Sequence, residues 1–241
     1  LGLNKEQVLV LSSPGSAKEP ISYLKNQLSG ITGVEQVASS SFSMFNGGYS
    51  IFFVPVPERE DNGVSINYMT IDANFVKLLG LEWLAEPNKP LANGDLILNK
   101  TATERLNMPD DPRGNKLALG GKSTIAGVVT NFKYSPLTNE VGPLAMRIRD
   151  EVTNVPGNEN SFIYLKISET SNIEAILQQI ENKMNEYRTA SPLEYYFLDD
   201  AFNDLFRSQE RLGYLFSIFS FIAVSVASLG LLGLVTFTLE R

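Results

Sequence analysis

The stretch FIYLKISETSNIEAILQQIENKMNEYRTASPLEYYFL, from Phe162 to Leu198, contains a complete strand–helix–strand pattern. Apolar residues alternate over Phe162 to Ile167, which predicts a half-buried strand. Ser171 and Glu174 then match a capping box, and the apolar residues behind them recur at helical spacing. Leu193 to Leu198 reads as a second strand, so this stretch predicts one β-α-β unit.

A second unit of the same kind lies at the other end of the chain, from Gln7 to Ser41. It comprises a strand at Gln7 to Ser12, an amphipathic helix at Pro20 to Leu28 and a strand at Val34 to Ser41. Each unit implies two parallel strands with a helix on one face. Each also leaves an apolar sheet face that needs cover, so we expect the two units to pack together in one lobe despite their separation.

The segment between the units is richer in turns and short strands. Asn62-Gly63 is a strong hairpin signal between strands predicted at Tyr49 to Val56 and at Val64 to Ile71. Shorter strands, turns and two short helices follow as far as Arg149.

The predicted fold class is therefore α+β. A discontinuous α/β lobe, residues 1–72 and 150–199, would carry an inserted β-rich lobe, residues 73–149. We expect a stalk helix at 200–213 and a transmembrane helix at 214–239 to follow.

The transmembrane prediction rests on the run LGYLFSIFSFIAVSVASLGLLGLVTFTL, from Leu212 to Leu239, which contains no charged residue. A bilayer core about 30 Å thick needs roughly 20 apolar residues in a helix. The alternative is a buried core helix. Before this run, no helix breaker stands between Asp200 and the apolar segment except Gly213, so we expect one continuous helix.

Two sets of residues on this helix are candidates for packing. Phe202, Leu205 and Phe206 would form an apolar face that docks the stalk on the membrane-proximal lobe. Small residues recur further along, at Ala223, Ala227, Gly230 and Gly233, and such a face lets another helix approach closely. Glycine and alanine are also simply common in membrane helices, so the second assignment stays open between these two interpretations.

Composition narrows the possible chemistry. The net charge is −7 and no basic stripe offsets it, so nucleic acid is not an expected partner. The chain contains no cysteine and no histidine, which removes thiolate nucleophiles, the usual general base and the commonest metal ligand. We therefore expect no catalytic, cofactor-binding or metal-binding residues and no enzymatic activity.

The run Gly120-Gly121-Lys122-Ser123-Thr124 resembles the end of a phosphate-binding loop. The full pattern needs a glycine where Lys116 stands, and it must open a helix, whereas here a strand is expected to follow. An ordinary β-turn with an exposed lysine explains the run better. The acidic groups of the chain also lack the spacing of a calcium loop.

Several stretches resemble bacterial ABC-transporter permeases of the MacB/FtsX type. They are the opening LGLNKEQVLVL, then YMTIDANFVKLLGLEWL, DLILNKTATERLNM and IAGVVTNFKYSPLTNEVGPLAMRI, and finally YYFLDDAFNDLFRSQERLGYLFSIFSFIAVSVASLGLLGLVTFTLER. Their order and spacing carry the resemblance, which covers nearly the whole chain. In that family such a domain lies between two transmembrane helices and is divided into a membrane-proximal and a distal lobe.

The resemblance implies a function and a set of partners. The domain would lie in the periplasm, or on the extracytoplasmic side, of the bacterial inner membrane. It would transmit conformational change driven by a cytoplasmic ATP-binding subunit. Its other partners would be a second permease copy or homologue, the lipid bilayer and an envelope protein. The alternative is an extracytoplasmic sensor or ligand-binding module of a membrane receptor.

Overall fold

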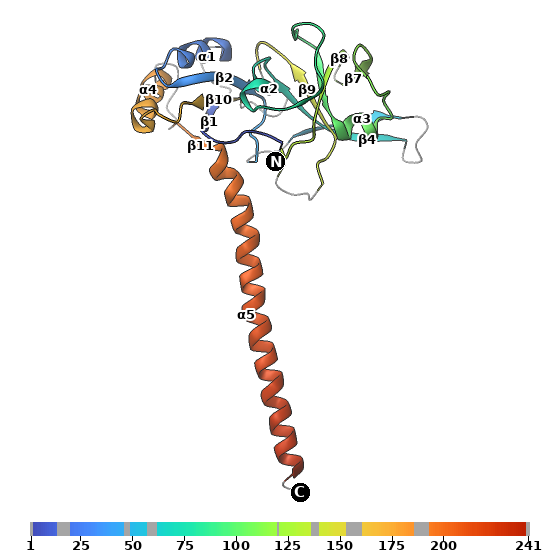
Figure 1. Ribbon diagram of the computed structural model, residues 1–241, viewed down its shortest axis with the longest axis vertical. Coiled ribbons are helices and arrows are strands. Elements are labelled where there is room, and N and C mark those ends of the chain that lie inside the picture. Colours follow the sequence, from blue (N-terminus) through green and yellow to red (C-terminus); the bar gives the residue numbers. More distant parts are fainter. Residues whose placement is uncertain are drawn as a thin grey trace. The chain divides into compact units, whose positions relative to one another are not determined.

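A computed structural model describes residues 2–13, 20–45, 49–56, 62–119, 121–135, 140–152, 161–185 and 193–239 of the chain (Figure 1). Two compact units are present, Leu1–Ala201 and Phe202–Arg241. The elements follow one another as β1 (Val8–Ser13), α1 (Ile21–Ser29), β2 (Val34–Ser40), β3 (Ser50–Pro55), β4 (Gly63–Ile71), α2 (Phe75–Leu78), β5 (Trp83–Ala85), β6 (Leu96–Asn99), α3 (Lys100–Arg105), β7 (Lys116–Ala118), β8 (Lys122–Val129), β9 (Leu144–Ile148), β10 (Ser161–Ile167), α4 (Ile173–Asn185), β11 (Tyr195–Phe197) and α5 (Leu198–Leu239).

One mixed sheet runs through the N-terminal unit. Its strand order is β11-β1-β10-β2-β4-β9-β6-β8-β5, with β3 attached to β4 and β7 attached to β8. The pairs β4–β9 and β6–β8 are parallel, and the other pairs of the described strands are antiparallel. The predicted α+β class agrees with this mixed sheet and its helices.

The two terminal β-α-β units interleave in this sheet. Strand β10 lies between β1 and β2 and is antiparallel to both, while β1 lies between β10 and β11. The prediction that β1 and β10 lie together is thereby confirmed, because Val8 pairs with Lys166 and the register continues to Ser13 opposite Ser161. The two strands of each unit run parallel, but a strand of the other unit separates them, as in a split β-α-β arrangement. Periodicity within one unit cannot show this separation.

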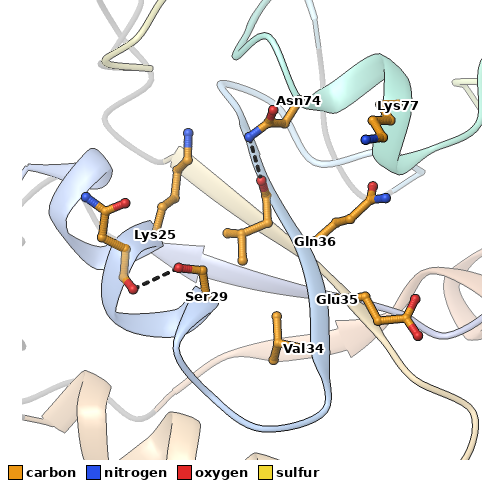
Figure 2. Close-up of a pocket in the computed structure, with 9 residues that line it drawn as sticks. Lys25, Ser29, Val34, Glu35, Gln36, Asn74 and Lys77 are labelled. Atoms are coloured by element: carbon orange, nitrogen blue, oxygen red, sulfur yellow. Dashed lines mark hydrogen bonds between the residues drawn. The ribbon is translucent and has the colours of Figure 1, made fainter.

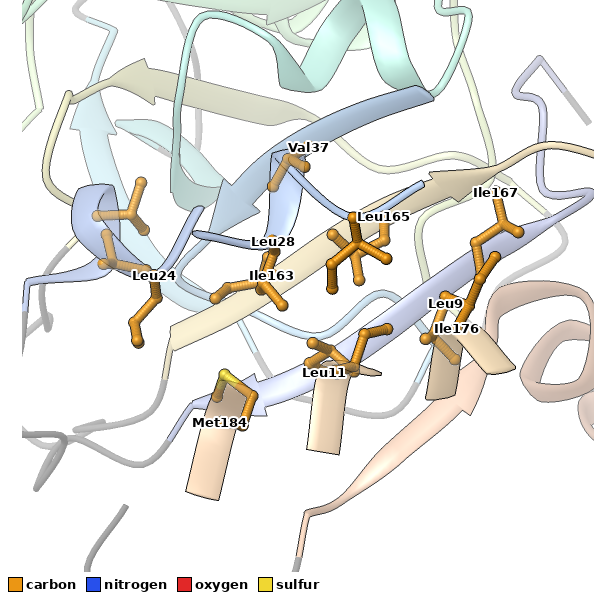
Figure 3. Close-up of a cluster of buried hydrophobic side chains, with 14 residues drawn as sticks. Leu9, Leu11, Leu24, Leu28, Val37, Ile163, Leu165, Ile167, Ile176 and Met184 are labelled. Carbon is orange, nitrogen blue, oxygen red and sulfur yellow. The ribbon is translucent and has the colours of Figure 1, made fainter. Parts of the chain in front are cut away.

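Helices α1 and α4 cover one face of the interleaved strands (Figure 3). Every third or fourth residue of each helix is apolar, so each helix presents one stripe to the sheet. The side chains that meet there are Leu24 and Leu28 of α1, Ile176, Ile180 and Met184 of α4, and Leu9, Leu11, Ile163 and Leu165 of β1 and β10. Fully burying one such side chain contributes about 1.5–3 kcal/mol, so this cluster ties the two ends of the sequence together.

The cap of α4 differs from the predicted capping box. The side-chain oxygen of Asn172 accepts the Ala175 N–H at 3.3 Å, and the helix begins at Ile173. Ser171 instead donates its own N–H to the Ser168 carbonyl at 3.1 Å, inside the preceding turn. The cap therefore lies one residue later than Ser171, because asparagine caps a helix as well as serine does.

A second apolar cluster fills the other half of the sheet. It combines Val54, Ile66 and Tyr68 of the β3–β4 hairpin with residues of β6 to β9 and of α3. The hairpin itself follows the prediction, because β3 and β4 pair antiparallel. Asn62 has a positive φ of 58°, but Gly63 already belongs to β4 and pairs with Pro55, so Asn62-Gly63 is not a two-residue turn. The division into lobes at 1–72 with 150–199 and at 73–149 stays a prediction.

The C-terminal unit belongs to α5, a helix of 42 residues that continues through Gly213 without a break. The side chains at 205–213, 215 and 232–238 lie outside the described residues. Within the described part of the chain, no helix has both the length and the hydropathy of a membrane-spanning segment. The division of α5 into a stalk at 200–213 and a transmembrane helix at 214–239 stays a prediction.

Candidate functional site

A cavity of about 280 Å³ opens between α1, β2 and α2 (Figure 2). Most of its lining residues are polar or charged. The lining residues are Lys25, Asn26 and Ser29 of α1, Val34, Glu35, Gln36 and Val37 of β2, and Asn74 and Lys77 beside and within α2. The Asn74 side-chain amide donates to the Val37 carbonyl at 3.3 Å and so joins the start of α2 to β2.

A buried carboxylate holds the three walls of this cavity in place. The Asp72 side chain is 5% exposed and forms an ion pair with Lys25. Its Oδ2 also accepts the N–H and the hydroxyl of Ser39, at 2.9 and 3.0 Å, and its Oδ1 accepts the Asn74 N–H at 3.0 Å. A buried charge needs this many partners to offset its lost hydration. Asp72 therefore joins the end of β4 to α1, β2 and the start of α2.

The chemistry of the cavity is that of hydrogen bonding and charge pairing. Two lysines, one glutamate, three carboxamides and the Ser29 hydroxyl line it, and this hydroxyl donates to the Asn26 carbonyl at 2.9 Å. Among the described residues, no group of three or more acidic side chains lies close enough to hold a metal ion. The cavity can accommodate a small polar molecule through hydrogen bonds and charge pairing.

A second polar network surrounds the segment Phe42 to Met44, which follows β2. The Tyr164 hydroxyl accepts the Met44 N–H at 2.9 Å and donates to the Phe42 carbonyl at 3.1 Å. The Tyr196 hydroxyl donates to the Met44 carbonyl at 3.1 Å and lies 2.6 Å from the Ser43 hydroxyl. Both tyrosines flank Val10 of β1 in the register of the sheet. They therefore tie the segment to β10 and β11.

Burial controls the ionisation of these two phenols. Loss of hydration raises the pKa of Tyr164 well above its usual value, and it raises the pKa of Tyr196 to about 12. Both hydroxyls therefore stay protonated at neutral pH and can act as donors to the segment.

The sequence-predicted packing residues occupy different surroundings. Phe202 is 9% exposed, whereas the side chains of Leu205 and Phe206 lie outside the described residues. Ala223, Ala227 and Gly230 are exposed on α5, and a methyl group added at Gly230 would meet no described atom within 4 Å. Gly233 lies outside the residues whose exposure is described. Both packing assignments stay predictions.

No local sequence pattern points to a functional role for Asp72, Lys25 or the two buried tyrosines. Asp72 lies in the stretch YMTIDANF, which belongs to one of the runs that resemble the permease family. Its local signal is an aspartate whose oxygen accepts the N–H two residues later, at Asn74. The partners Lys25 and Ser39 are 47 and 33 positions away, so no local pattern points to them.

The fold resembles solved extracytoplasmic domains of transporters. No protein-family model and no curated protein sequence matches the chain. The periplasmic region of MacB from Actinobacillus actinomycetemcomitans is 13% identical, with a TM-score of 0.59 over 85% of this chain and 94% of that one.

Two other solved structures give the same result. A domain of a putative permease protein from Porphyromonas gingivalis is 12% identical, with a TM-score of 0.54 over 79% of this chain and 89% of that one. The extracellular domain of the noncanonic ABC-type transporter YknZ from Gram-positive bacteria is 14% identical, with a TM-score of 0.52 over 77% and 99% of the two chains. This chain therefore has the fold of a MacB-type periplasmic domain.

Proposed function

We propose that this chain is the extracytoplasmic domain of an ABC-transporter permease, together with the transmembrane helix that follows the domain. In this proposal the domain lies in the periplasm, or on the outer side, of a bacterial inner membrane. A cytoplasmic ATP-binding subunit drives conformational change, and the domain passes this motion on for export or for mechanotransmission across the envelope. A second permease copy or homologue and an envelope protein complete the assembly.

The observation that carries the proposal is the apolar surface of α5, the helix that directly follows the MacB-like fold. Large apolar side chains are exposed along its described turns, including Phe216 at 70%, Phe221 at 75% and Leu229 at 68%. Exposed apolar area costs about 25 cal/mol per Å² in water, and a surface this extensive marks an interaction site. A lipid bilayer is the environment that covers all sides of one helix.

The polar residues within this surface are consistent with a lipid environment. The Ser225 hydroxyl donates to the Phe221 carbonyl, and the Ser228 hydroxyl donates to the Val224 carbonyl, both at 2.8 Å. A hydroxyl bonded to the carbonyl one turn earlier needs no water. Since hydrocarbon offers no hydrogen-bond partner, such internal bonding is what a membrane helix requires.

Cysteine labelling tests the proposed topology, because the chain contains no cysteine of its own. Glu169 is exposed in the turn before α4, so Glu169→Cys should react with a membrane-impermeant maleimide in cells with an intact inner membrane. Glu240→Cys should react only after that membrane is opened. The reverse pattern, or recovery of the chain in the soluble fraction, would contradict the proposal.

We also propose that the domain performs no catalysis and binds no nucleotide. The Gly121-Lys122 turn leads into strand β8, as the sequence predicts, and not into the helix of a phosphate-binding loop. Calorimetry with ATP should therefore give no heat of binding at micromolar protein. Micromolar binding that Lys122→Ala abolishes would refute this part of the proposal.

A ligand-binding sensor is the second candidate, and the cavity beside Asp72 favours it. A sensor would show a rise in melting temperature with one small polar compound, and Lys77→Ala in the cavity wall would remove that rise. A permease domain would show no such rise in melting temperature. An ATP-binding subunit would instead co-purify with it from a membrane extract. The two outcomes separate the candidates.

A further inference from the structure

Strand β3 has an open edge that the apolar core leaves uncovered. Among the described strands, β3 pairs with β4 alone. Ile51 is 68% exposed and Phe53 is 59% exposed. Because side chains alternate along a strand, these two lie on the same face. Phe52 points to the other face, where its ring lies 4.9 Å from that of Tyr68.

The hydrogen bonds of the hairpin determine which main-chain groups face outward. The Val56 N–H donates to the Asn62 carbonyl at 3.2 Å. In an antiparallel pair, bonded and non-bonded positions alternate, so Val54 and Phe52 also direct their main-chain groups toward β4. The N–H and C=O groups of Ile51 and Phe53 therefore point away from β4, along the open edge.

We propose that β3 pairs antiparallel with β3 of a second copy of this chain, with the two-fold axis at Phe52. Ile51 of each copy then lies opposite Phe53 of the other. Every outward N–H and C=O of these two residues is used, which makes four main-chain hydrogen bonds. The interface is isologous, because the same strand contributes both sides.

The side chains of β3 suit this self-pairing. Each Ile51–Phe53 contact is a cross-strand pair of a β-branched and an aromatic residue, a favourable combination. The strand contains no charged residue, so two copies with a net charge of −7 each bring no like charges together here. Natural edge strands are often protected by lysine, and β3 has none.

The register at Phe52 is the one that the sequence favours. Centring the pair on Phe53 would place Pro55 opposite Ile51, and proline has no N–H to donate. Centring it on Ile51 would place Phe53 opposite Tyr49, which lies outside β3. Pairing at Phe52 needs neither residue for its four hydrogen bonds between Ile51 and Phe53, and it leaves Pro55 beyond the end of this ladder.

This strand pair buries much less than the roughly 1,600 Å² of a typical stable interface. It is therefore one contact within a dimer and fixes the register of two neighbouring copies. The inference goes beyond the proposed function and does not depend on transport, because it rests on the edge of β3 alone.

Disulfide trapping in the full chain, purified in a non-denaturing detergent, tests the register directly. Directly opposed residues of a bonded pair have Cα atoms about 5.5 Å apart, within disulfide range. A mixture of Ile51→Cys and Phe53→Cys chains carrying different tags should therefore form about ten times more heterodisulfide than a mixture of Ser65→Cys and Phe53→Cys chains. Ser65 is a matched control, because it is exposed and pairs with Phe53 from the inner strand β4.

A second pair of variants tests the main-chain bonds. Phe53→Pro removes an N–H that β4 does not use, whereas Phe53→Val keeps this N–H and an apolar side chain. Pull-down of one tagged copy by another should be weaker with proline than with valine, while the thermal unfolding of the two variants stays similar.

Three results would overturn the inference. One is a heterodisulfide yield no higher than that of the Ser65→Cys control. Another is equal self-association of the proline and valine variants. The third is trapping of Ile51→Cys, in native membranes, by a different protein and not by a second copy.

Discussion

At the scale of single residues, buried polar groups determine how the segments around the cavity and the tyrosine network are held. Asp72 is the clearest case, because one carboxylate accepts hydrogen bonds from Lys25 and Ser39 of distant segments and from the nearby Asn74. Tyr164 and Tyr196 act similarly on the segment after β2. Each group is bonded because an unpaired buried polar atom would cost roughly 1–3 kcal/mol.

Asp72→Asn should lower the free energy of unfolding by about 3 kcal/mol, because it leaves the Lys25 ammonium without its buried counter-charge. Thermal and urea unfolding, followed by circular dichroism, measure the change. Asp111→Asn is the control, since Asp111 pairs with Arg113 on the surface and exposed pairs contribute little. A loss for Asp72→Asn no larger than that of the control would show that the buried ion pair is unimportant.

Tyr196 makes stability depend on pH in the alkaline range. Its pKa is about 12 in the folded chain and about 10 in an unfolded one. The unfolded chain therefore loses this proton first, so the stabilisation is complete below pH 10 and is lost as the pH rises toward 12.

Tyr196→Phe should make the fall in unfolding free energy between about pH 10 and pH 12 shallower. It should also cost about 1–2 kcal/mol at neutral pH through the lost hydrogen bonds. Urea unfolding at a series of pH values measures both effects. Tyr195→Phe, at the exposed neighbouring position, should change neither, and an unchanged alkaline slope in Tyr196→Phe would contradict the assignment.

At the scale of elements, the junctions between helices and strands decide how closely α1 and α4 pack. Gly33 connects α1 to β2 with a φ of +95°. A side chain there would lie 2.5 Å from the Ser171 hydroxyl and 2.8 Å from a methyl group of Ile176. This glycine therefore allows the start of α4 to approach the turn between α1 and β2.

Gly33→Ala should destabilise the domain by about 2–4 kcal/mol, through strained backbone and overpacking together. Gly114→Ala separates the two causes, because Gly114 also has a positive φ, +86°, but nothing within 4 Å of an added methyl group. We expect it to cost only about 1 kcal/mol. Equal losses in thermal unfolding would mean that contact with α4 is irrelevant.

At the scale of the whole molecule, α5 is the element through which the proposed coupling would pass. The helix begins directly after β11 and includes Gln209 and Gly213 without interruption. A continuous helix can transmit a displacement along its axis, whereas a break would absorb it.

Gln209→Pro should therefore uncouple the full permease, because proline costs about 3 kcal/mol in a helix interior and kinks it. ATP hydrolysis should stay measurable while transport is lost. Gln209→Ala is the control, since alanine preserves the helix and should keep both activities. Full transport by the proline variant at normal expression would show that coupling does not need an unbroken helix.

Much of the local structure follows from the sequence alone. Alternating and helical apolar spacings predict β1, α1, β10 and α4, and Asn62-Gly63 predicts the β3–β4 hairpin. These features depend on neighbouring residues, whose periodicity reports which face is buried. The sequence also predicts that β1 and β10 belong together, because each unit leaves an apolar face that needs cover.

Only the tertiary structure shows how those elements are arranged relative to one another within the sheet. It placed β10 between β1 and β2, paired Asp72 with Lys25, and directed the main chain of Ile51 and Phe53 toward an open edge. The physical reason is the same in each case. Strand order, ion pairing across 47 positions and edge exposure depend on which distant segments meet, and a local apolar pattern is compatible with several such meetings.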